Sequence, residues 1–236
     1  MAPATFYKKL ENRVKKTRDK VVPVEEAMSF AESGLTLMIG GFLAHGTPEL
    51  LIDKLVEKGV RDLTVIANDT GMPDKGIGKL VGKGQVRSCY VSHIGTNPET
   101  GRLLNSGKLE VNLVPQGTLV ERIRCGGSGL GGVLTPTGLG TGIAEGKEIL
   151  VIDGKEYLLD KPLRAQIAFL KAHKADKAGN LQYRGTSANF NPVMALAADL
   201  VVAQVDEVVE VGEIDPNRLH TPGILVDMLV VGGGGR

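Results

Sequence analysis

The first half of the chain repeats one pattern of apolar and polar positions. Short strand-like segments, the first of them a continuous apolar run at residues 35–39, alternate with segments whose apolar residues recur at helical spacing, and a Gly-rich or polar loop follows each strand-like segment. Continuous apolar runs are typical of strands buried on both faces, and their alternation with helices predicts a parallel α/β sheet. We therefore expect an open, mainly parallel sheet with helices on both faces. The predicted strands are residues 35–39, 63–67, 86–91 and 109–114.

Capping signals place the helices of this half. Pro or an N-cap residue begins each predicted helix, and Gly ends it. Thr118 and Glu121 have the spacing of a capping box, and the helix they begin would end at Gly126. The expected helices are residues 23–33, 48–58, one that opens at Asn97-Pro98 and one over 118–125.

After residue 145 the pattern becomes richer in strands. Residues 149–152 and 156–159 flank Asp153-Gly154, which has the composition of a two-residue hairpin turn. This gives a β-rich C-terminal part, and no clean boundary separates it from the first half. Further strands are predicted over 166–171, 181–183, 200–205 and 225–231, with a short helix over 192–198.

The two ends of the chain differ from this pattern. Residues 6–20 carry an apolar stripe at Phe6, Leu10 and Val14 and seven Lys or Arg against two acids. A basic amphipathic helix can indicate membrane or organelle targeting, but a solvated helix on the rim of the domain is the simpler interpretation. We expect a basic N-terminal helix extension at 1–21, one domain at 22–231 and a flexible tail at 232–236.

Composition narrows the possible functions. The chain has 236 residues, a net charge of +1, no Trp and only 4% aromatic residues, which argues against nucleic-acid binding. No apolar run is long enough for a membrane span. Cys89 and Cys125 are far apart in sequence and suggest reduced thiols in a cytoplasmic protein.

Glycine is the most unusual component, with 32 residues in the chain and nine between Pro115 and Gly142. Gly-rich stretches are often mobile surface loops. Here apolar residues such as Leu119, Ile123 and Val133 interleave with the glycines, whereas a free linker would carry Ser and Lys. We expect a folded, glycine-lined wall that another group approaches closely.

The carboxyl ends of parallel strands meet at one edge of a sheet, where ligands bind. The loops that begin at Gly40, Asn68, Ser92 and Pro115 should therefore share one cleft. Its polar side chains have ordinary structural interpretations: Asp69 as a turn residue, and the acids and histidines as capping or shaping groups. No His or Cys has metal-ligand spacing, and no nucleophile stands out. The other candidates on this edge are His45, His93, Glu49 and Glu99.

Specific motifs in these loops resemble one known family. The chain is similar from about residue 22 to 231 to the alpha subunits of family I coenzyme A transferases, and looks most like bacterial acetate/acetoacetate and butyrate–acetoacetate CoA-transferases. The motifs are Gly40-Gly41-Phe42-x-x-x-Gly46-x-Pro48, Asn68-Asp69, Ser92-His93-Ile94-Gly95-x-Asn97-Pro98, Val114-Pro115-Gln116-Gly117, Arg124-Cys125-Gly126-Gly127 and Asn189-Phe190-Asn191-Pro192.

The resemblance implies transfer of CoA from a short-chain acyl-CoA to a free carboxylic acid such as acetate, butyrate or acetoacetate. The reaction passes through a glutamyl-CoA thioester, with CoA as a substrate, no permanently bound cofactor and no metal. The family's glutamate lies in a Ser-Glu-Asn-Gly motif of the beta subunit. That motif is absent here, so the resemblance implies no catalytic residue in this chain, a beta-subunit partner and an α2β2 or higher oligomer.

The resemblance also assigns roles to cleft residues. It makes the first Gly-rich loop the CoA-binding segment, whose backbone N–H groups and glycines would allow close approach to CoA. It places the second group in the substrate pocket, where His93 is less certain because some relatives have Tyr there. The first group is Gly40, Gly41, Phe42, Leu43, Ala44, His45 and Gly46, and the second is Asn68, His93, Gln116 and Gly117.

Two other interpretations remain open at this point. A sugar-phosphate isomerase-like or effector-binding α/β domain can share the architecture, but residues 40–48 contain no Lys or Arg to bind phosphate. A scaffolding subunit whose glycines serve only packing is the other alternative.

Overall fold

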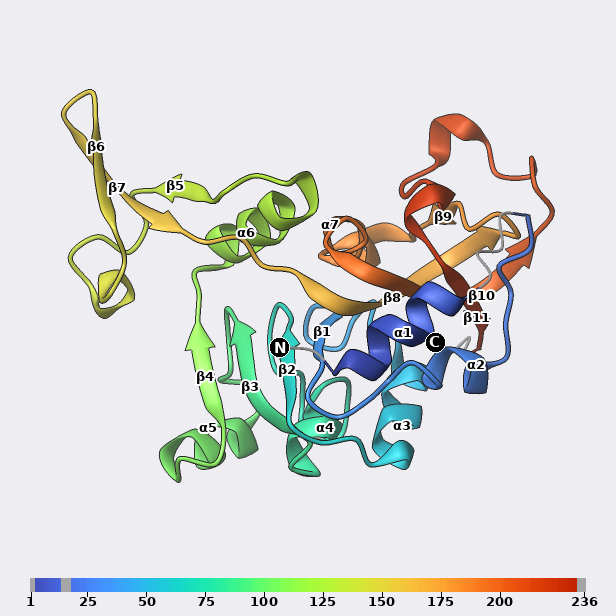
Figure 1. Ribbon diagram of the computed structural model, residues 1–236, viewed down its shortest axis with the longest axis horizontal. Coiled ribbons are helices and arrows are strands. Elements are labelled where there is room, and N and C mark those ends of the chain that lie inside the picture. Colours follow the sequence, from blue (N-terminus) through green and yellow to red (C-terminus); the bar gives the residue numbers. More distant parts are fainter. Residues whose placement is uncertain (1–2, 14–17, 233–236) are drawn as a thin grey trace.

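A computed structural model describes residues 3–13 and 18–232, and its centre is one eight-stranded sheet (Figure 1). The strand order is β11-β10-β8-β1-β2-β3-β4, with every pair along this path parallel, and β9 pairs antiparallel with β8. The strands are β1 Thr36–Ile39, β2 Leu63–Ile66, β3 Val86–Val91, β4 Glu110–Leu113, β8 Ala165–Asp176, β9 Leu181–Gln182, β10 Ala198–Val209 and β11 Met228–Val231.

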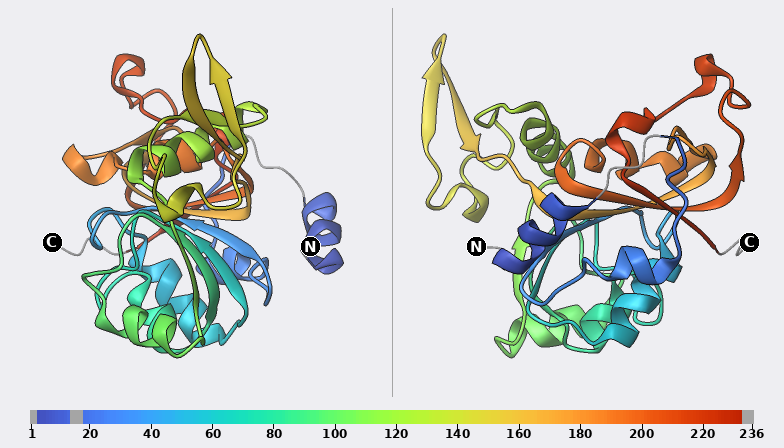
Figure 2. Two further views of the ribbon diagram at one scale, coloured as in Figure 1. Left: turned by 90° about the vertical axis from the view of Figure 1, so that its left-hand side faces the viewer. Right: turned by 45° about the vertical axis from the view of Figure 1, so that its right-hand side comes forward.

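Helices cover both faces of this sheet, as Figures 1 and 2 show. One face carries α1 to α5 and the other carries α6 and α7. The mainly parallel α/β fold predicted from the apolar pattern is thereby confirmed. The helices are α1 Ala4–Asn12, α2 Val24–Met28, α3 Glu49–Lys58, α4 Gly78–Gly82, α5 Pro98–Asn105, α6 Gln116–Ser128 and α7 Asn191–Met194.

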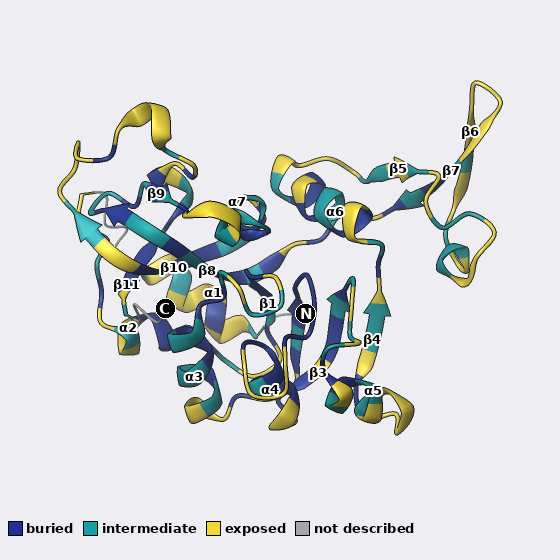
Figure 3. Cartoon of the chain, turned by 180° about the vertical axis from the view of Figure 1, so that it is seen from behind, coloured by how far each residue is buried: buried dark blue, intermediate teal, exposed yellow. Residues whose placement is uncertain are grey.

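The alternation of side chains along each strand divides the interior into two hydrophobic clusters. Leu37 and Ile39 of β1 pack with α3 on one face, whereas Met38 between them packs with α6 on the other. All three side chains are fully buried. This burial on both faces explains why the central strands are continuous apolar runs, and Figure 3 shows them as the buried centre of the molecule.

The β-rich last third contributes to two different sheets. β8, β10 and β11 extend the main parallel sheet, so this part continues the first half instead of forming a separate layer. The predicted hairpin at Asp153-Gly154 is present, with both residues at positive φ. It belongs to a small antiparallel sheet of β5 Val133–Thr135, β7 Lys155–Asp160 and β6 Ile149–Ile152. We call residues 133–160 the arm, because it projects from the body in Figures 1 and 2.

The N-terminal helix is shorter than predicted and packs on the domain. α1 ends at Asn12, and residues 14–17 of the predicted helix lie outside the described residues. Phe6 is fully buried in the same cluster as α3, so α1 is not simply a solvated helix. Lys9 and Arg13 form ion pairs with Glu32 and Asp227 of this same chain. The division at residues 21 and 231 stays a prediction, and residues 233–236 of the predicted tail are not described.

The predicted ends of α6 are wrong at both termini. The helix begins at Gln116, no side chain caps it, and it continues through Gly126 to a left-handed cap at Gly129. Gly126 lies inside the helix. The position requires glycine because a Cβ there would stand 2.0 Å from the carbonyl oxygen of Leu163. Close packing therefore accounts for this glycine, and neither the Thr118–Glu121 spacing nor Gly126 marks an end of the helix. The helix predicted at 23–33 is also short and ends at Met28, and α4 was not predicted.

Candidate functional site

The loop between β1 and α3, residues 40–46, is a tight turn. The backbone N–H of Phe42 donates to the His45 carbonyl at 2.9 Å, and the N–H of His45 donates back at 2.8 Å. Leu43 and Ala44 between them have φ of 47° and 65°. A two-residue turn of this kind needs positive φ at both central positions, which is costly for residues with a side chain. Other contacts must therefore hold the turn in place.

The glycines of this loop face other parts of the same chain. A Cβ at Gly40 would stand 1.8 Å from Oδ1 of Asn191, and one at Gly41 would stand 2.0 Å from Oγ1 of Thr47. Five backbone N–H groups of the loop also have partners within the chain, at residues 40, 41, 42, 43 and 45. The loop therefore offers fewer free N–H groups than expected, and Gly40 and Gly41 approach this chain's own side chains; the assignment of the loop to CoA stays a prediction. What the loop exposes is the Phe42 side chain, 44% accessible, and His45.

Three strand-end loops are joined by side-chain hydrogen bonds. Nε2 of Gln116, at the start of α6, donates to Oδ1 of Asn68 at 2.6 Å. Nδ2 of Asn68, which follows β2, donates to Oδ2 of Asp69 at 2.7 Å. The same Asp69 oxygen accepts the backbone N–H of Leu43 at 2.9 Å. The predicted meeting of these loops at one edge of the sheet is therefore present, with Asp69 at its centre.

The loop after β3 completes this edge through its backbone and small hydroxyls. Oγ of Ser92 donates to the Asn68 carbonyl at 2.7 Å, and the Ser92 N–H donates to the same oxygen at 2.8 Å. His93 forms a β-bridge with Asp69, while its ring is exposed beside Gly95. The structure thus brings Asn68 and Gln116 together, and it places His93 beside them without a direct side-chain bond.

The N-terminus of α6 borders open space. Pro115 occupies the N-cap position, where no side chain bonds the first turn. Gln116 and Gly117 are exposed, and a Cβ at Gly117 would meet nothing within 4 Å. Backbone N–H groups at a helix N-terminus favour negative charge. This position can therefore accept a carboxylate or a developing oxyanion beside the Gln116 amide.

The two predicted cleft acids at helix starts have structural partners. Glu49 accepts the backbone N–H of Gly76 at 2.8 Å and pairs with Lys79 at 2.6 Å, so it ties α3 to the segment before α4. Glu99 lies in the first turn of α5, and the hydrogen bond from Arg102 lowers the pKa of its carboxyl. Neither acid is part of the hydrogen-bonded set around Asp69.

The described part of the chain offers no activated nucleophile near these residues. Cys89 and Cys125 are free thiols and both are buried. Burial raises the pKa of the Cys89 thiol to about 12, which keeps it protonated at neutral pH. Within residues 3–13 and 18–232, no group of three or more His, Cys, Asp or Glu could hold a metal ion, and no helix is long and apolar enough to cross a membrane.

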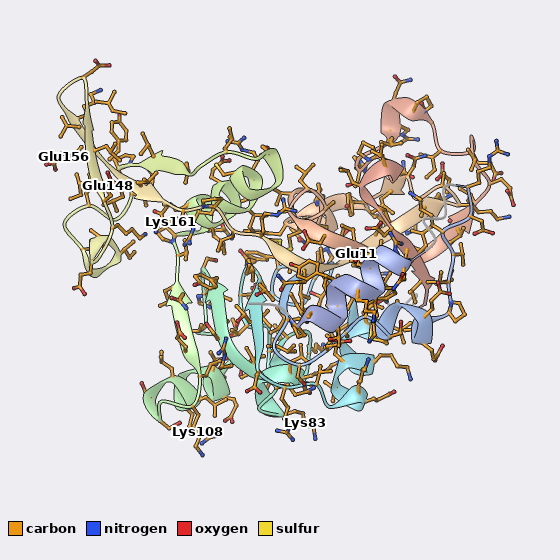
Figure 4. All side chains as sticks on the ribbon, in the orientation of Figure 1. Glu11, Lys83, Lys108, Glu148, Glu156 and Lys161 are labelled. Carbon is orange, nitrogen blue, oxygen red and sulfur yellow. The ribbon has the colours of Figure 1, made fainter. Side chains whose placement is uncertain are left out.

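A cavity of about 510 Å³ that sequence reasoning missed lies between β3, β4 and the arm. Arg122 of α6 lies over the Tyr90 ring at 5.6 Å, and burial lowers the pKa of its guanidinium. Lys147 pairs at 2.8 Å with Asp160, which is 2% exposed. Figure 4 labels Lys161 where the chain leaves the arm. These residues are distant in sequence and share no motif, so only the folded position of the arm reveals the cavity.

Comparison with known proteins gives one consistent result. The family model described as Coenzyme A transferase matches residues 21–232. Acetate CoA-transferase subunit alpha of Escherichia coli K12 is 53% identical over 214 residues, which cover 91% of this chain and 97% of that protein. The acetoacetyl-CoA:acetate/butyrate CoA transferase alpha subunit of Clostridium acetobutylicum is 51% identical over 211 residues, covering 89% of this chain and 97% of that one.

A solved structure extends the similarity to the fold. The acyl-CoA transferase of Escherichia coli O157:H7 superimposes with a TM-score of 0.83 at 25% identity, over 93% of this chain. The match covers 48% of that protein, so this chain spans about half the length of the solved relative.

Proposed function

This chain belongs to the coenzyme A transferase family, and we propose that it is the alpha subunit of a short-chain acyl-CoA:carboxylate CoA-transferase. The acceptor would be a small acid such as acetate, butyrate or acetoacetate. One observation carries the proposal: the exposed residues Gln116 and Gly117 at the start of α6, with the Gln116 amide held by buried Asn68, form a polar site that has no nucleophile of its own. Such a site suits a reaction whose nucleophile comes from another chain.

The proposed chemistry transfers CoA through a covalent intermediate. A glutamate carboxylate of the second subunit attacks the acyl-CoA carbonyl carbon, and the CoA thiolate leaves to give a mixed anhydride. The thiolate then attacks the glutamyl carbonyl, which releases the first acid and leaves a glutamyl-CoA thioester. The second acid reverses these steps and takes the CoA. In this scheme CoA is a substrate, and we expect no permanently bound cofactor.

In this mechanism the alpha subunit binds and orients. Each carbonyl attack develops negative charge on oxygen, which N–H donors stabilise when they are already in position. The second N–H of the Gln116 amide, the one that is not donated to Asn68, and the N–H groups at the start of α6 are suited to this task. Phe42, Leu43 and His45 would contact CoA through their side chains, because most N–H groups of their loop are already bonded.

The split site requires a second subunit. Support comes from the relatives whose printed names call them alpha subunits, and from the solved transferase chain that is about twice as long as the matched region. We expect an α2β2 or higher oligomer. Free, buried Cys89 and Cys125 support a reducing, cytoplasmic location.

The alternative of a sugar-phosphate isomerase-like or effector-binding domain is not favoured. The loop at residues 40–48 has no Lys or Arg for a phosphate, and its glycines at 40 and 41 pack against Asn191 and Thr47 of this chain. Family membership over residues 21–232 points the same way.

Reconstitution tests the proposal directly. The chain is purified alone and together with its second subunit, and acetyl-CoA is mixed with butyrate or acetoacetate. We expect exchange only from the complex. Intact-mass measurement after acyl-CoA alone should show one CoA attached, with loss of water, on the second subunit and none on this chain. Exchange by the isolated chain, or a CoA adduct on it, would contradict the split site.

A further inference from the structure

Asp69 is a buried carboxylate whose hydrogen-bond partners are all uncharged. It is 4% exposed, and it accepts from the backbone N–H of Leu43 and Gly71 and from Nδ2 of Asn68, at 2.9, 2.7 and 2.7 Å. Burial of a carboxylate is costly, and three donors offset part of that cost. A role in the turn alone does not explain why the residue is a buried carboxylate, because uncharged Asn or Ser would stabilise the same turn.

An ionised carboxylate fixes the direction of the amides beyond it. It can only accept hydrogen bonds, so the Asn68 amide must present its nitrogen to Asp69. The oxygen of Asn68 then faces Gln116, and because Oδ1 can only accept, Gln116 can bond it only with a donor; Oγ of Ser92 is a second, longer donor to the same oxygen, at 3.3 Å. Gln116 must therefore present Nε2 to Asn68, which is the observed contact at 2.6 Å. The orientation of the Gln116 amide toward the open site follows from a charge two residues away in this chain of bonds.

The same oxygen of Asp69 also holds the turn of the first loop. It accepts the N–H of Leu43, the first of two consecutive residues at positive φ. One atom, Oδ2 of Asp69, therefore holds both the turn beside Phe42 and the Asn68 amide that orients Gln116.

We propose that Asp69 is a positioning residue for CoA transfer, which sets the amide polarity of Asn68 and Gln116 and links it to the turn at Leu43-Ala44. This inference rests on the proposed function. Asp69 itself acts through Gln116 and is not expected to contact the substrate.

The test is a double-mutant cycle on the complex with the second subunit. Asp69→Asn keeps the shape and places a donor where an acceptor stood, so the amides beyond it lose their fixed direction. We expect Gln116→Ala to lower kcat roughly 10²-fold, the scale of one lost transition-state donor. Asp69→Asn should lower kcat roughly tenfold, and the double variant should stay within about threefold of Gln116→Ala alone.

Independent losses would multiply instead, to roughly 10³-fold in the double variant, and would show that Asp69 does not act through Gln116. An unchanged kcat in Asp69→Asn would also overturn the proposal. Failure of the proposed function has a different signature, because the wild-type complex would then show no CoA transfer.

A matched control separates polarity from general damage. Asp176 is another buried carboxylate, 2% exposed, and it accepts from the backbone N–H and Nδ2 of Asn180 at 3.0 and 2.7 Å. Asp176→Asn makes the same change at the far end of β8, and kcat should remain at the wild-type value.

A second variant covers the case in which Asp69→Asn does not fold. Asn68→Ala removes the link while both backbone contacts of Asp69 remain, and its loss in kcat should likewise fail to multiply with that of Gln116→Ala. Multiplying losses there would overturn the proposal equally.

Discussion

The glycines of the first loop are required by packing within the chain and not by the approach of a ligand. The glycines at 40 and 41 suggest backbone that approaches a ligand, yet their free faces are filled by Asn191 and Thr47. Gly117 is the opposite case, since it has no neighbour within 4 Å and lies in the first turn of α6. Of these three glycines, only Gly117 offers open space to a substrate.

Gly117→Ala tests whether that space is used. Alanine favours a helix over glycine by up to about 1 kcal/mol, and the new methyl group meets no protein atom, so the Tm should hold or rise. If substrate occupies the space, kcat/KM should fall roughly tenfold or more, the scale of a small group added to a fitted pocket.

Gly101→Ala is the control, because Gly101 lies in α5 with equally open surroundings. Equal activity for both variants would remove Gly117 from the substrate pocket.

Helices and strands could be predicted from the sequence where the local pattern of apolar residues matches their burial in the fold. The strands at 35–39 and 63–67 are almost fully buried, so their apolar character sufficed, whereas the strand at 109–114 is the half-exposed edge strand and followed from its place in the alternation of strands and helices. The helix that begins after Asn97 has the predicted cap, with its side chain accepting the Glu99 N–H at 3.2 Å. The termini of α6 could not be predicted, because Gly126 is required by contact with Leu163, 37 residues later in the chain.

The candidate site shows the same limit. Motif resemblance found Asn68 and Gln116, whereas Asp69 looked like a turn residue, since hydrogen bonds across three loops leave no trace in local sequence. The cavity beside Arg122 was missed for the same reason.

At the scale of an element, α1 is held by a few contacts. Phe6 is fully buried against the domain, and Tyr7 donates to Asp199 at 3.3 Å. Loss of a buried Phe side chain costs about 3–5 kcal/mol in a rigid core. A nine-residue terminal helix can detach instead, so the cost cannot exceed the free energy of docking α1.

Phe6→Ala should therefore release α1 and leave the sheet intact. We expect faster amide hydrogen exchange at residues 4–12, a modest fall in Tm and unchanged kcat in the complex. The exposed Lys8 gives the control, since Lys8→Ala should leave exchange at 4–12 unchanged. A global rise in exchange after Phe6→Ala would show that α1 is an integral part of the core.

On the scale of the whole molecule, apolar surface gathers at one end of the sheet. Within the described arm only Leu158 and Asp160 are buried, although the arm is a three-stranded sheet. Figure 4 places Glu148 and Glu156 among its side chains. Exposed apolar patches of this kind mark interaction sites. The large apolar side chains exposed here are Leu113, Leu130, Leu134, Ile149, Val151 and Ile152.

The position of this surface indicates what covers it. β4 is the edge strand of the main sheet, and the chain reaches Gln116, beside which the site has no nucleophile, three residues after the strand ends at Leu113. We therefore expect a second subunit that brings a glutamate to Gln116 to approach past this edge, between β4 and the arm. The cavity lined by Arg122 and Lys147 lies along the same approach.

Val151→Asp tests this approach. Val151 is 65% exposed on β6, so the change should leave the isolated chain folded while it places an unpaired charge in the interface. We expect the Kd for the second subunit to rise roughly tenfold or more, with kcat restored when that subunit is in excess. Ile224→Asp is the control, because Ile224 is 91% exposed in the turn before β11, at the other end of the sheet. Equal Kd values for the two variants would contradict an interface at the arm. A normal Kd with a halved oligomer mass would instead assign the arm to contacts between two alpha subunits.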